Sequence, residues 1–132
     1  MVYREAALAV CPSCGMGLLR MSVRGFELAR CESCQGVWVD ERTLAELWRF
    51  MGMPPQLLAL APAIQERPRP CPSCRQNMRY VHLLTVKLDH CPACGVWFDG
   101  QELEAAMAFP DSKSERDWLA MFASELSRGE PA

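Results

Sequence analysis

The sequence lacks the features that mark membrane proteins, strongly charged binders and most enzymes. Among its 132 residues no apolar run approaches the roughly 18 residues that span a bilayer. Lys and Arg number 14 against 16 Asp and Glu, so the formal net charge of −2 excludes a histone-like polycation and an acidic solvating tail. Histidine occurs only twice, and there is no Ser–His–Asp set, glycine-rich phosphate loop or cluster of catalytic carboxylates. We therefore expect a protein that is not an enzyme.

The beginning of the chain also lacks an export signal. Its only apolar stretch there, Ala6 to Val10, is too short for the core of a signal peptide. We expect the chain to stay in the cytoplasm, where thiols remain reduced and disulfide frameworks are rare. Half of the residues are hydrophobic and 23% are charged, which is typical of a folded soluble protein.

Cysteine is abundant, and its spacing is regular. All eight cysteines lie in four C-x-x-C pairs, and the second set of four repeats the spacing of the first set after a shift of sixty positions. This is an internal duplication. Two knuckles separated by sixteen residues match the spacing of four-cysteine zinc sites. The sequence therefore predicts two zinc ions per chain, one bound by Cys11, Cys14, Cys31 and Cys34 and the other by Cys71, Cys74, Cys91 and Cys94.

Each repeat predicts a β-hairpin between its knuckles and a helix after them. Arg24-Gly25 is a plausible turn in the first hairpin, whereas the second hairpin contains no clear turn residue. Asp40 and Asp99 stand where a helix N-cap belongs, and Glu102 completes a capping-box pattern in the second repeat, where the first repeat has Thr43.

The fold expected from these elements is a small metal-stabilised α+β fold, with two tandem zinc ribbons, a helix after each, and a C-terminal helix. Five prolines surround a short apolar run between the repeats, which predicts a linker with one or two helical turns. The expected organisation is a zinc ribbon with its helix at 1–53, a proline-rich linker at 54–70, a second ribbon with its helix at 71–109, and a C-terminal helix and tail at 110–132.

Both repeats carry a longer matched motif, CPSCGMGL…RCESCQGVWVDERTL in the first and CPSCRQNM…HCPACGVWFDGQEL in the second. These motifs resemble the bacterial zinc ribbons of the transcription-factor-IIB type over about residues 10–50 and 70–108. The resemblance implies a zinc-ribbon fold and little about biochemistry. The sequence departs from the family pattern in three places: Cys31-Glu32 lacks the proline, Cys74-Arg75 lacks the glycine, and the Cys94-Gly95-Val96 loop is one residue shorter than its counterpart.

Other interpretations of the cysteines and histidines are weaker. A redox C-x-x-C needs an exposed thiol of low pKa at a helix start, whereas these pairs lie on predicted hairpins. A rubredoxin-like iron site uses similar knuckles, and the family resemblance favours zinc over iron. Four cysteines already fill a tetrahedral sphere, so we expect His82 and His90 to lie on the surface or to support a ligand. Trp38 and Trp97 recur beside the cysteines, and we expect them to form the core of each ribbon.

Charge and aromatic residues suggest how the protein acts. With thiolates and two zinc ions counted, the net charge is about −6. The preferred hypothesis is an interaction or adaptor module that binds a protein partner, with no membrane association, and that presents helix faces carrying Trp48, Phe50, Trp118 and Phe122. One alternative is a nucleic-acid-binding, transcription-associated protein that uses Arg67, Arg69, Arg75 and Arg79. Another is a thiol redox sensor in which oxidation releases zinc.

Overall fold

The first repeat folds as a three-stranded ribbon followed by a helix. The computed structural model describes residues 9–65, 67–84, 86–108 and 115–131, except for the side chains of 105–119 and 131. The expectation for the N-terminal apolar stretch concerns residues that lie largely outside this part of the chain. Strands β1 (Leu19–Val23) and β2 (Phe26–Arg30) form the predicted hairpin, and β3 (Val37–Asp40) leads into helix α2 (Glu41–Phe50). The turn at Arg24-Gly25 has positive φ at both residues, of 51° and 87°, which matches the right-handed twist of the strands.

The second repeat forms the same elements. Strands β5 (Arg79–Leu83) and β6 (Val86–Cys91) make its hairpin, and β7 (Gly95–Phe98) precedes helix α3 (Gly100–Ala108). Leu84, at the hairpin turn, has a φ of 57°. A leucine in the left-handed region is uncommon, which is why this turn gave no signal in the sequence.

Both helices begin at the predicted aspartates. The Asp40 carboxylate accepts hydrogen bonds of 2.9 Å from the backbone N–H and the hydroxyl of Thr43. Asp99 accepts a bond of 2.9 Å from the Gln101 N–H, and its own N–H donates to the Glu102 carboxylate at 2.9 Å. The capping arrangements satisfy N–H groups that the first helical turn leaves without partners.

The segments outside the repeats join the same structure. Residues 54–70 contain the 3-10 turn Pro55–Leu57 and the strand β4 (Leu60–Pro62), so the expected linker adds a strand to the sheet as well as a helical turn. The predicted C-terminal helix is α4 (Glu115–Ser127), and it is followed by the short strand β8 (Glu130–Pro131).

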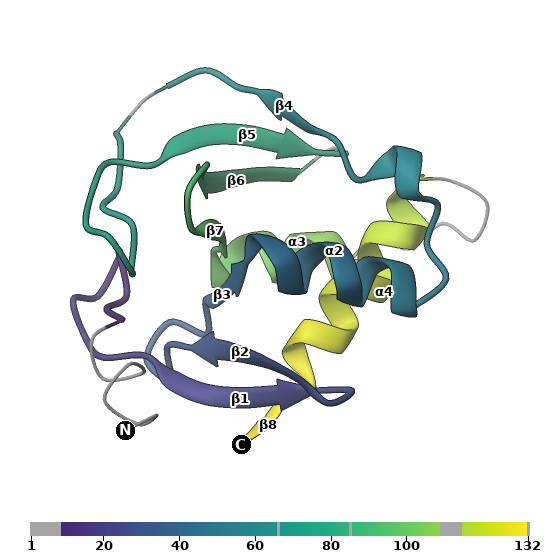
Figure 1. Ribbon diagram of the computed structural model, residues 1–132, viewed down its shortest axis with the longest axis horizontal. Helices are drawn as coiled ribbons and strands as arrows, with labels where there is room; N and C mark the ends of the chain where they lie inside the picture. Colours follow the sequence, from purple (N-terminus) through teal and green to yellow (C-terminus); the bar gives the residue numbers. More distant parts are fainter. Residues whose placement is uncertain (1–8, 66, 85, 109–114, 132) are drawn as a thin grey trace.

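The two repeats share one antiparallel sheet. Its eight strands run in the order β4-β5-β6-β7-β3-β2-β1-β8, and the repeats meet where β3 pairs with β7, with Trp38 opposite Trp97. Figure 1 shows the two hairpins on opposite sides of the helices, connected through β3 and β7. No helix in the described part of the chain is long and apolar enough to cross a membrane.

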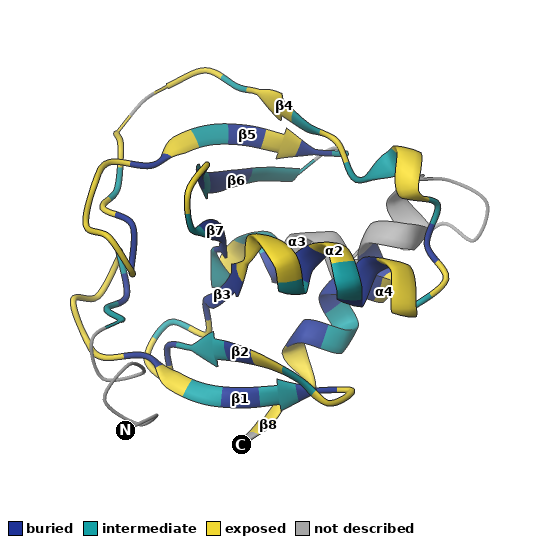
Figure 2. Ribbon diagram, viewed as in Figure 1, coloured by how far each residue is buried: buried dark blue, intermediate teal, exposed yellow. Residues whose placement is uncertain are grey.

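The core lies between the hairpins and the helices. Phe122 of α4 packs between Trp48 of α2 and Phe98 of β7, with ring centroids 5.1 and 5.9 Å apart. Trp48 is 1% exposed and Phe122 is 0% exposed. Figure 2 shows that both α2 and α4 carry buried segments. The expectation that these two rings face a partner is therefore wrong, because both lie in the hydrophobic core. Trp118 lies outside the described side chains.

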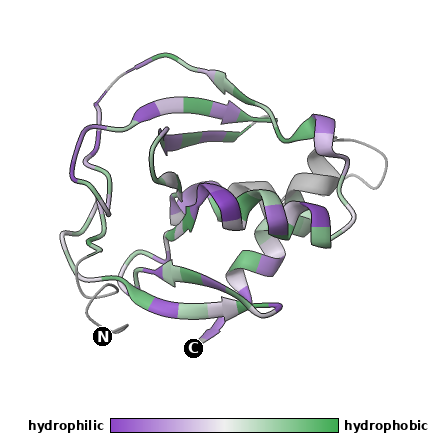
Figure 3. Cartoon of the chain, viewed as in Figure 1, coloured by the Kyte–Doolittle hydropathy of each residue, from purple (hydrophilic) through white to green (hydrophobic). Residues whose placement is uncertain are grey.

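Hydrophilic and hydrophobic residues alternate along α2 (Figure 3). Its apolar side, formed by Leu44, Leu47 and Trp48, is buried. The opposite side is exposed and ends at Phe50, which is 59% exposed. Phe50 thus remains on the surface, as the sequence suggested, and it packs edge-on against Phe26 with ring centroids 5.7 Å apart.

Candidate metal centres

The eight cysteines gather into two groups that follow the order of the sequence. Cluster 1 consists of Cys11, Cys14, Cys31 and Cys34, and cluster 2 consists of Cys71, Cys74, Cys91 and Cys94. Within each cluster all Sγ atoms lie within 4.8 Å of one another. Each cluster is positioned to bind one metal ion.

The sulfur positions can be compared with those that zinc requires. A tetrahedral ion with Zn–S bonds of about 2.3 Å places neighbouring sulfurs about 3.8 Å apart. The Sγ atoms of Cys11 and Cys34 are 3.7 Å apart, and those of Cys74 and Cys91 are 3.8 Å apart. The donor sets therefore fit two zinc ions.

Backbone N–H groups of the knuckles point at the sulfurs. Cys11 Sγ accepts from the N–H groups of Ser13, at 3.3 Å, and Cys14, at 3.2 Å. Cys71 Sγ accepts from those of Ser73 and Cys74 at 3.3 and 3.4 Å. These bonds stabilise negative charge on sulfur, which is the state that binds a metal.

The knuckle turns explain one departure from the family pattern. Gly15 has a φ of 75° and donates its N–H to the Cys11 carbonyl at 2.9 Å. Arg75 stands at the equivalent position with a φ of 71° and makes the same bond to Cys71 at 3.0 Å. The turn geometry is therefore kept without the glycine, at the conformational cost that an L-residue has in the left-handed region.

Burial makes the last thiol of each cluster a poor anion on its own. Burial, followed by hydrogen bonding to the neighbouring thiols, raises the pKa of Cys34 to about 12. The same two causes raise the pKa of Cys94 to about 12. Four sulfurs this close together repel one another as thiolates, and a divalent cation among them removes that repulsion. A bound metal ion would therefore stabilise the thiolate form of both clusters.

A hydrophobic cluster surrounds the buried cysteines of both repeats. Trp38 is 8% exposed and Trp97 is 0% exposed, and both pack with cysteines, with Leu18 and with Met78. The expectation that the tryptophans form the core beside the metal sites is confirmed. This hydrophobic cluster contains cysteines of both repeats, so the two candidate metal sites share their apolar surroundings.

The histidines belong to neither cluster. His90 Nε2 lies 3.1 Å from the Glu41 carboxylate, so this side chain links β6 to the start of α2. His82 is exposed on β5. The groups of metal-binding side chains found among the described residues contain only cysteines, in agreement with the expected surface or supporting roles.

One arginine of the basic stretch, Arg69, is committed to internal ion pairs. Arg69 Nη1 lies 3.0 Å from Asp99 Oδ2 and 3.5 Å from Asp89 Oδ2. Asp89 is 2% exposed, and burial raises its pKa to about 6 although Arg69 opposes the shift. The first repeat has Ala9 and Ala29 at the positions of Arg69 and Asp89. The sequence signal for this ion pair is that an arginine and an aspartate replace two alanines at equivalent positions of the repeats.

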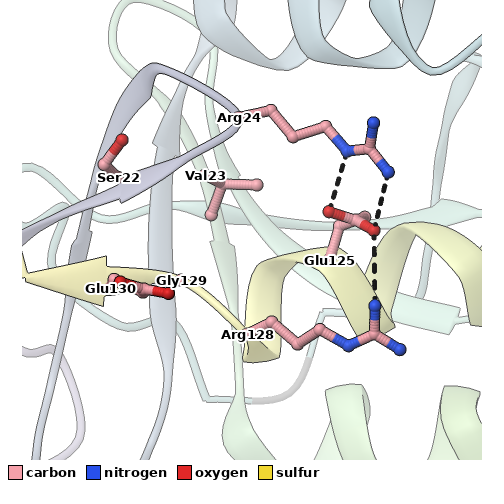
Figure 4. A pocket seen from close by; sticks show the side chains of 7 residues that line it. All are labelled: Ser22, Val23, Arg24, Glu125, Arg128, Gly129 and Glu130. Atoms are coloured by element: carbon pink, nitrogen blue, oxygen red, sulfur yellow. Dashed lines mark hydrogen bonds and ion pairs between the residues drawn. The ribbon is translucent and has the colours of Figure 1, made fainter.

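A second polar cluster attaches α4 to the first hairpin. Figure 4 shows Arg24 and Arg128 on either side of Glu125, beside a pocket of about 390 Å³. Arg24 donates to both oxygens of Glu125, at 2.9 and 3.1 Å, and lowers the pKa of that carboxyl group. The arrangement joins elements about a hundred positions apart in sequence and contains no nucleophile paired with a base.

The comparisons with known proteins agree with this geometry. A family model described as transcription factor zinc-finger matches residues 10–49 and 70–108, which together make up more than half of the chain. Each matched stretch contains one complete four-cysteine cluster. No curated protein and no solved structure matches the chain.

Proposed function

The chain belongs to the transcription factor zinc-finger family, and from this premise we propose that it is a non-catalytic adaptor that presents two structural zinc ribbons to a protein partner. The observation that carries the proposal is the pair of complete sulfur clusters, whose spacing fits tetrahedral zinc. The ligands would be the four cysteines of each cluster. Zinc would hold the knuckles closed, and the ribbons would supply the binding surface.

The completeness of each cluster supports the absence of catalysis. Catalytic zinc sites have three protein ligands and keep the fourth position open for water or substrate. Four cysteines in each cluster leave no such position. The proposed role of zinc is therefore to contribute folding free energy to a small domain.

Large apolar side chains on the surface support protein binding. Among the side chains that the structure describes, five large apolar ones are more than 40% exposed: Met16, Leu19, Phe50, Ile64 and Met121. Phe50 is the strongest candidate among them because its ring is already held against Phe26 and would lose little conformational freedom on binding.

The first experiment is elemental analysis of the purified full-length protein. We expect two zinc ions per chain and no visible absorption. One metal ion per chain, or the visible spectrum of an iron–thiolate site, would contradict the zinc assignment. For the adaptor role, cross-linking in native cytoplasm should identify a partner that Phe50→Ala loses and that Arg42→Ala, an exposed change on the same helix, retains.

The structure weakens the support for nucleic-acid binding. Arg69 already lies between two carboxylates, so the basic stretch offers fewer charges to phosphates than its sequence suggests. Labelled DNA and RNA should bind weakly at physiological salt. Sub-micromolar binding that Arg67→Ala with Arg79→Ala abolishes would favour the nucleic-acid alternative, because nonspecific contacts reach only about 10⁻⁴–10⁻⁶ M. This double variant leaves the Arg69 ion pairs intact.

A further inference from the structure

The two metal clusters lie on a common seam where the repeats join. Strands β3 and β7 pair along their whole length, from Val37 opposite Phe98 to Asp40 opposite Gly95. The knuckles also touch directly, since the Val10 N–H donates to the Pro72 carbonyl at 3.2 Å. Backbone hydrogen bonds therefore connect the two repeats at both the strands and the knuckles.

The start of each helix contacts the last cysteine of the opposite repeat. The N–H of Glu41, the first residue of α2, donates to the Cys94 carbonyl of cluster 2 at 3.2 Å. At the equivalent position in the second repeat, Gly100 begins α3 against the Cys34 carbonyl of cluster 1. A Cβ at Gly100 would lie 2.1 Å from that carbonyl oxygen. The contacts are reciprocal, and neither is made within a single repeat.

The glycine at position 100 has no local explanation. Its φ lies outside the left-handed range that favours glycine, and the equivalent residue in α2 is a glutamate. Glycine is required only because the Cys34 carbonyl of the other repeat is so close. The knuckle loop at Cys34 is the longer of the two, by one residue, and the shorter loop at Cys94 faces Glu41, which carries a side chain. The longer loop therefore lies against a glycine, and the shorter loop lies against a residue with a side chain.

From this geometry we propose that the two sites bind their metal ions cooperatively, with Gly100 a positioning residue for cluster 1 and the Glu41 N–H a positioning group for cluster 2. The inference rests on the proposed zinc sites. When cluster 2 holds no metal ion, β7 and the start of α3 are no longer fixed in place. Cluster 1 then loses the contacts that these segments make with β3 and with Cys34. By linkage, the effect of each site on the other is equal. Couplings of this kind change affinity by about 5–150-fold.

Native mass spectrometry of the full chain in zinc–chelator buffers measures the coupling. At half saturation, independent sites leave about half of the chains or more with one zinc, whereas the expected coupling lowers that share to about a third or less. A singly loaded share of half or more would overturn the proposal. Saturation at a number other than two would instead contradict the zinc assignment, so the two failures are distinguishable.

Substitutions at the start of each helix locate the coupling. Gly100→Ala should raise helix propensity. We nevertheless expect it to weaken metal binding at cluster 1, because the added Cβ would clash with the Cys34 carbonyl oxygen. The control is Gly17→Ala, where nothing lies within 4 Å of the added Cβ. Glu41→Pro removes one N–H at a helix position that accepts proline, and the extended Asp40 before it is compatible with the ring. Glu41→Ala, which keeps that N–H, is its control.

Cadmium-113 NMR of the cadmium-loaded chain resolves the sites, with the signals assigned by Cys31→Ser. In competition with a chelator, Gly100→Ala should lose the cluster 1 signal at lower chelator concentration than Gly17→Ala, and Glu41→Pro should do the same to the cluster 2 signal relative to Glu41→Ala. We expect shifts of about fivefold or more. If each variant matches its control at the cluster of the opposite repeat, the proposal is wrong. Folding failure in one variant leaves the other to decide.

Discussion

At the scale of single residues, the internal duplication provides a control for each side chain. Arg69 and Asp89 form an ion pair at positions where the first repeat has Ala9 and Ala29. The same ribbon therefore forms with or without the pair. Asp89 Oδ1 and the Trp97 indole N–H, on cross-strand partners, are buried without a hydrogen-bond partner among the described residues. The pair is thus a feature of the second repeat rather than a requirement of the fold.

Removing Arg69 alone should lower the free energy of unfolding more than removing both members of the ion pair. Arg69→Ala leaves the Asp89 carboxylate buried without compensation, and we expect it to lower the free energy of unfolding by about 1–3 kcal/mol. Arg69→Ala with Asp89→Ala restores the alanine pair of the first repeat and should recover most of the loss. Urea unfolding of the zinc-loaded variants measures both values. A double variant less stable than Arg69→Ala would contradict this interpretation.

Glu102 makes stability depend on pH near neutrality. Burial, together with the charges of Asp99 and Asp89, raises its pKa to about 7. The folded state therefore binds a proton more tightly than the unfolded state, and this contribution to stability falls as pH rises through 7. Glu102→Gln keeps an acceptor for the Asp99 N–H and carries no charge. We expect it to stabilise the protein by on the order of 1 kcal/mol at pH 8 and by less at pH 6. An equal effect at both pH values would exclude this cause.

At the scale of elements, the sequence identified those with local signals. Both hairpins, both capped helices and α4 were predicted, because strand patterning, N-cap residues and helical period are short-range properties. The strands β4 and β8 gave no such signal because they are short and exist only by pairing at the two edges of the sheet. The pairing of β3 with β7 also escaped prediction, since both segments were interpreted as parts of separate ribbons.

Besides Arg24, one arginine of β2 contacts the end of α4. The Arg30 guanidinium donates to the carbonyls of Leu126 and Ser127, both at 2.9 Å, and of Gly129, at 3.3 Å. It thereby caps the negative end of the helix. Arg30→Gln should increase hydrogen exchange at the end of α4 and destabilise the fold by about 1–2 kcal/mol.

The control for this change is Arg20→Gln, which removes an ion pair between Arg20 and the exposed Glu27. A surface pair of this kind contributes about 0–1 kcal/mol, so exchange in α4 should not change. Equal exchange at the end of α4 in the two variants would show that Arg30 does not hold the helix.

At the scale of the whole molecule, the cysteine pattern predicted both cysteine clusters, whereas the single sheet and the two hydrophobic clusters that the repeats share were not predicted. The repeated pattern predicted two tandem ribbons in separate stretches of the chain, which favours ribbons that bind zinc independently. The shared cluster of Trp38, Trp97 and cysteines from both repeats leads us to expect otherwise. Long-range pairing between repeats leaves no mark in a local pattern of residues, which is why the duplication was interpreted as two separate units.

A fragment of residues 1–53 tests this revision. It retains all of cluster 1 and loses the β7 partner of β3 together with the contact from Gly100. We expect it to bind zinc at least about fivefold more weakly than the full chain, as the coupling implies. Competition with a chromogenic chelator measures both affinities. Equal affinity would restore the interpretation of independent ribbons.

Metal removal should unfold the protein as one unit. Zinc binding to structural sites contributes about 10–16 kcal/mol at neutral pH, more than the core of a small domain supplies. Chelation should therefore abolish hydrogen-exchange protection in both hairpins and in the buried part of α4. Protection that persists in one hairpin after both metals are removed would show that its strands fold without zinc.

We propose that each cluster holds one zinc ion through four sulfurs. X-ray absorption at the zinc edge of the purified full chain, combined with its metal content, tests this directly. We expect two zinc ions per chain and a single shell of four sulfurs at about 2.3 Å. A nitrogen or oxygen shell at about 2.0–2.1 Å, or fewer than two zinc ions per chain, would contradict it.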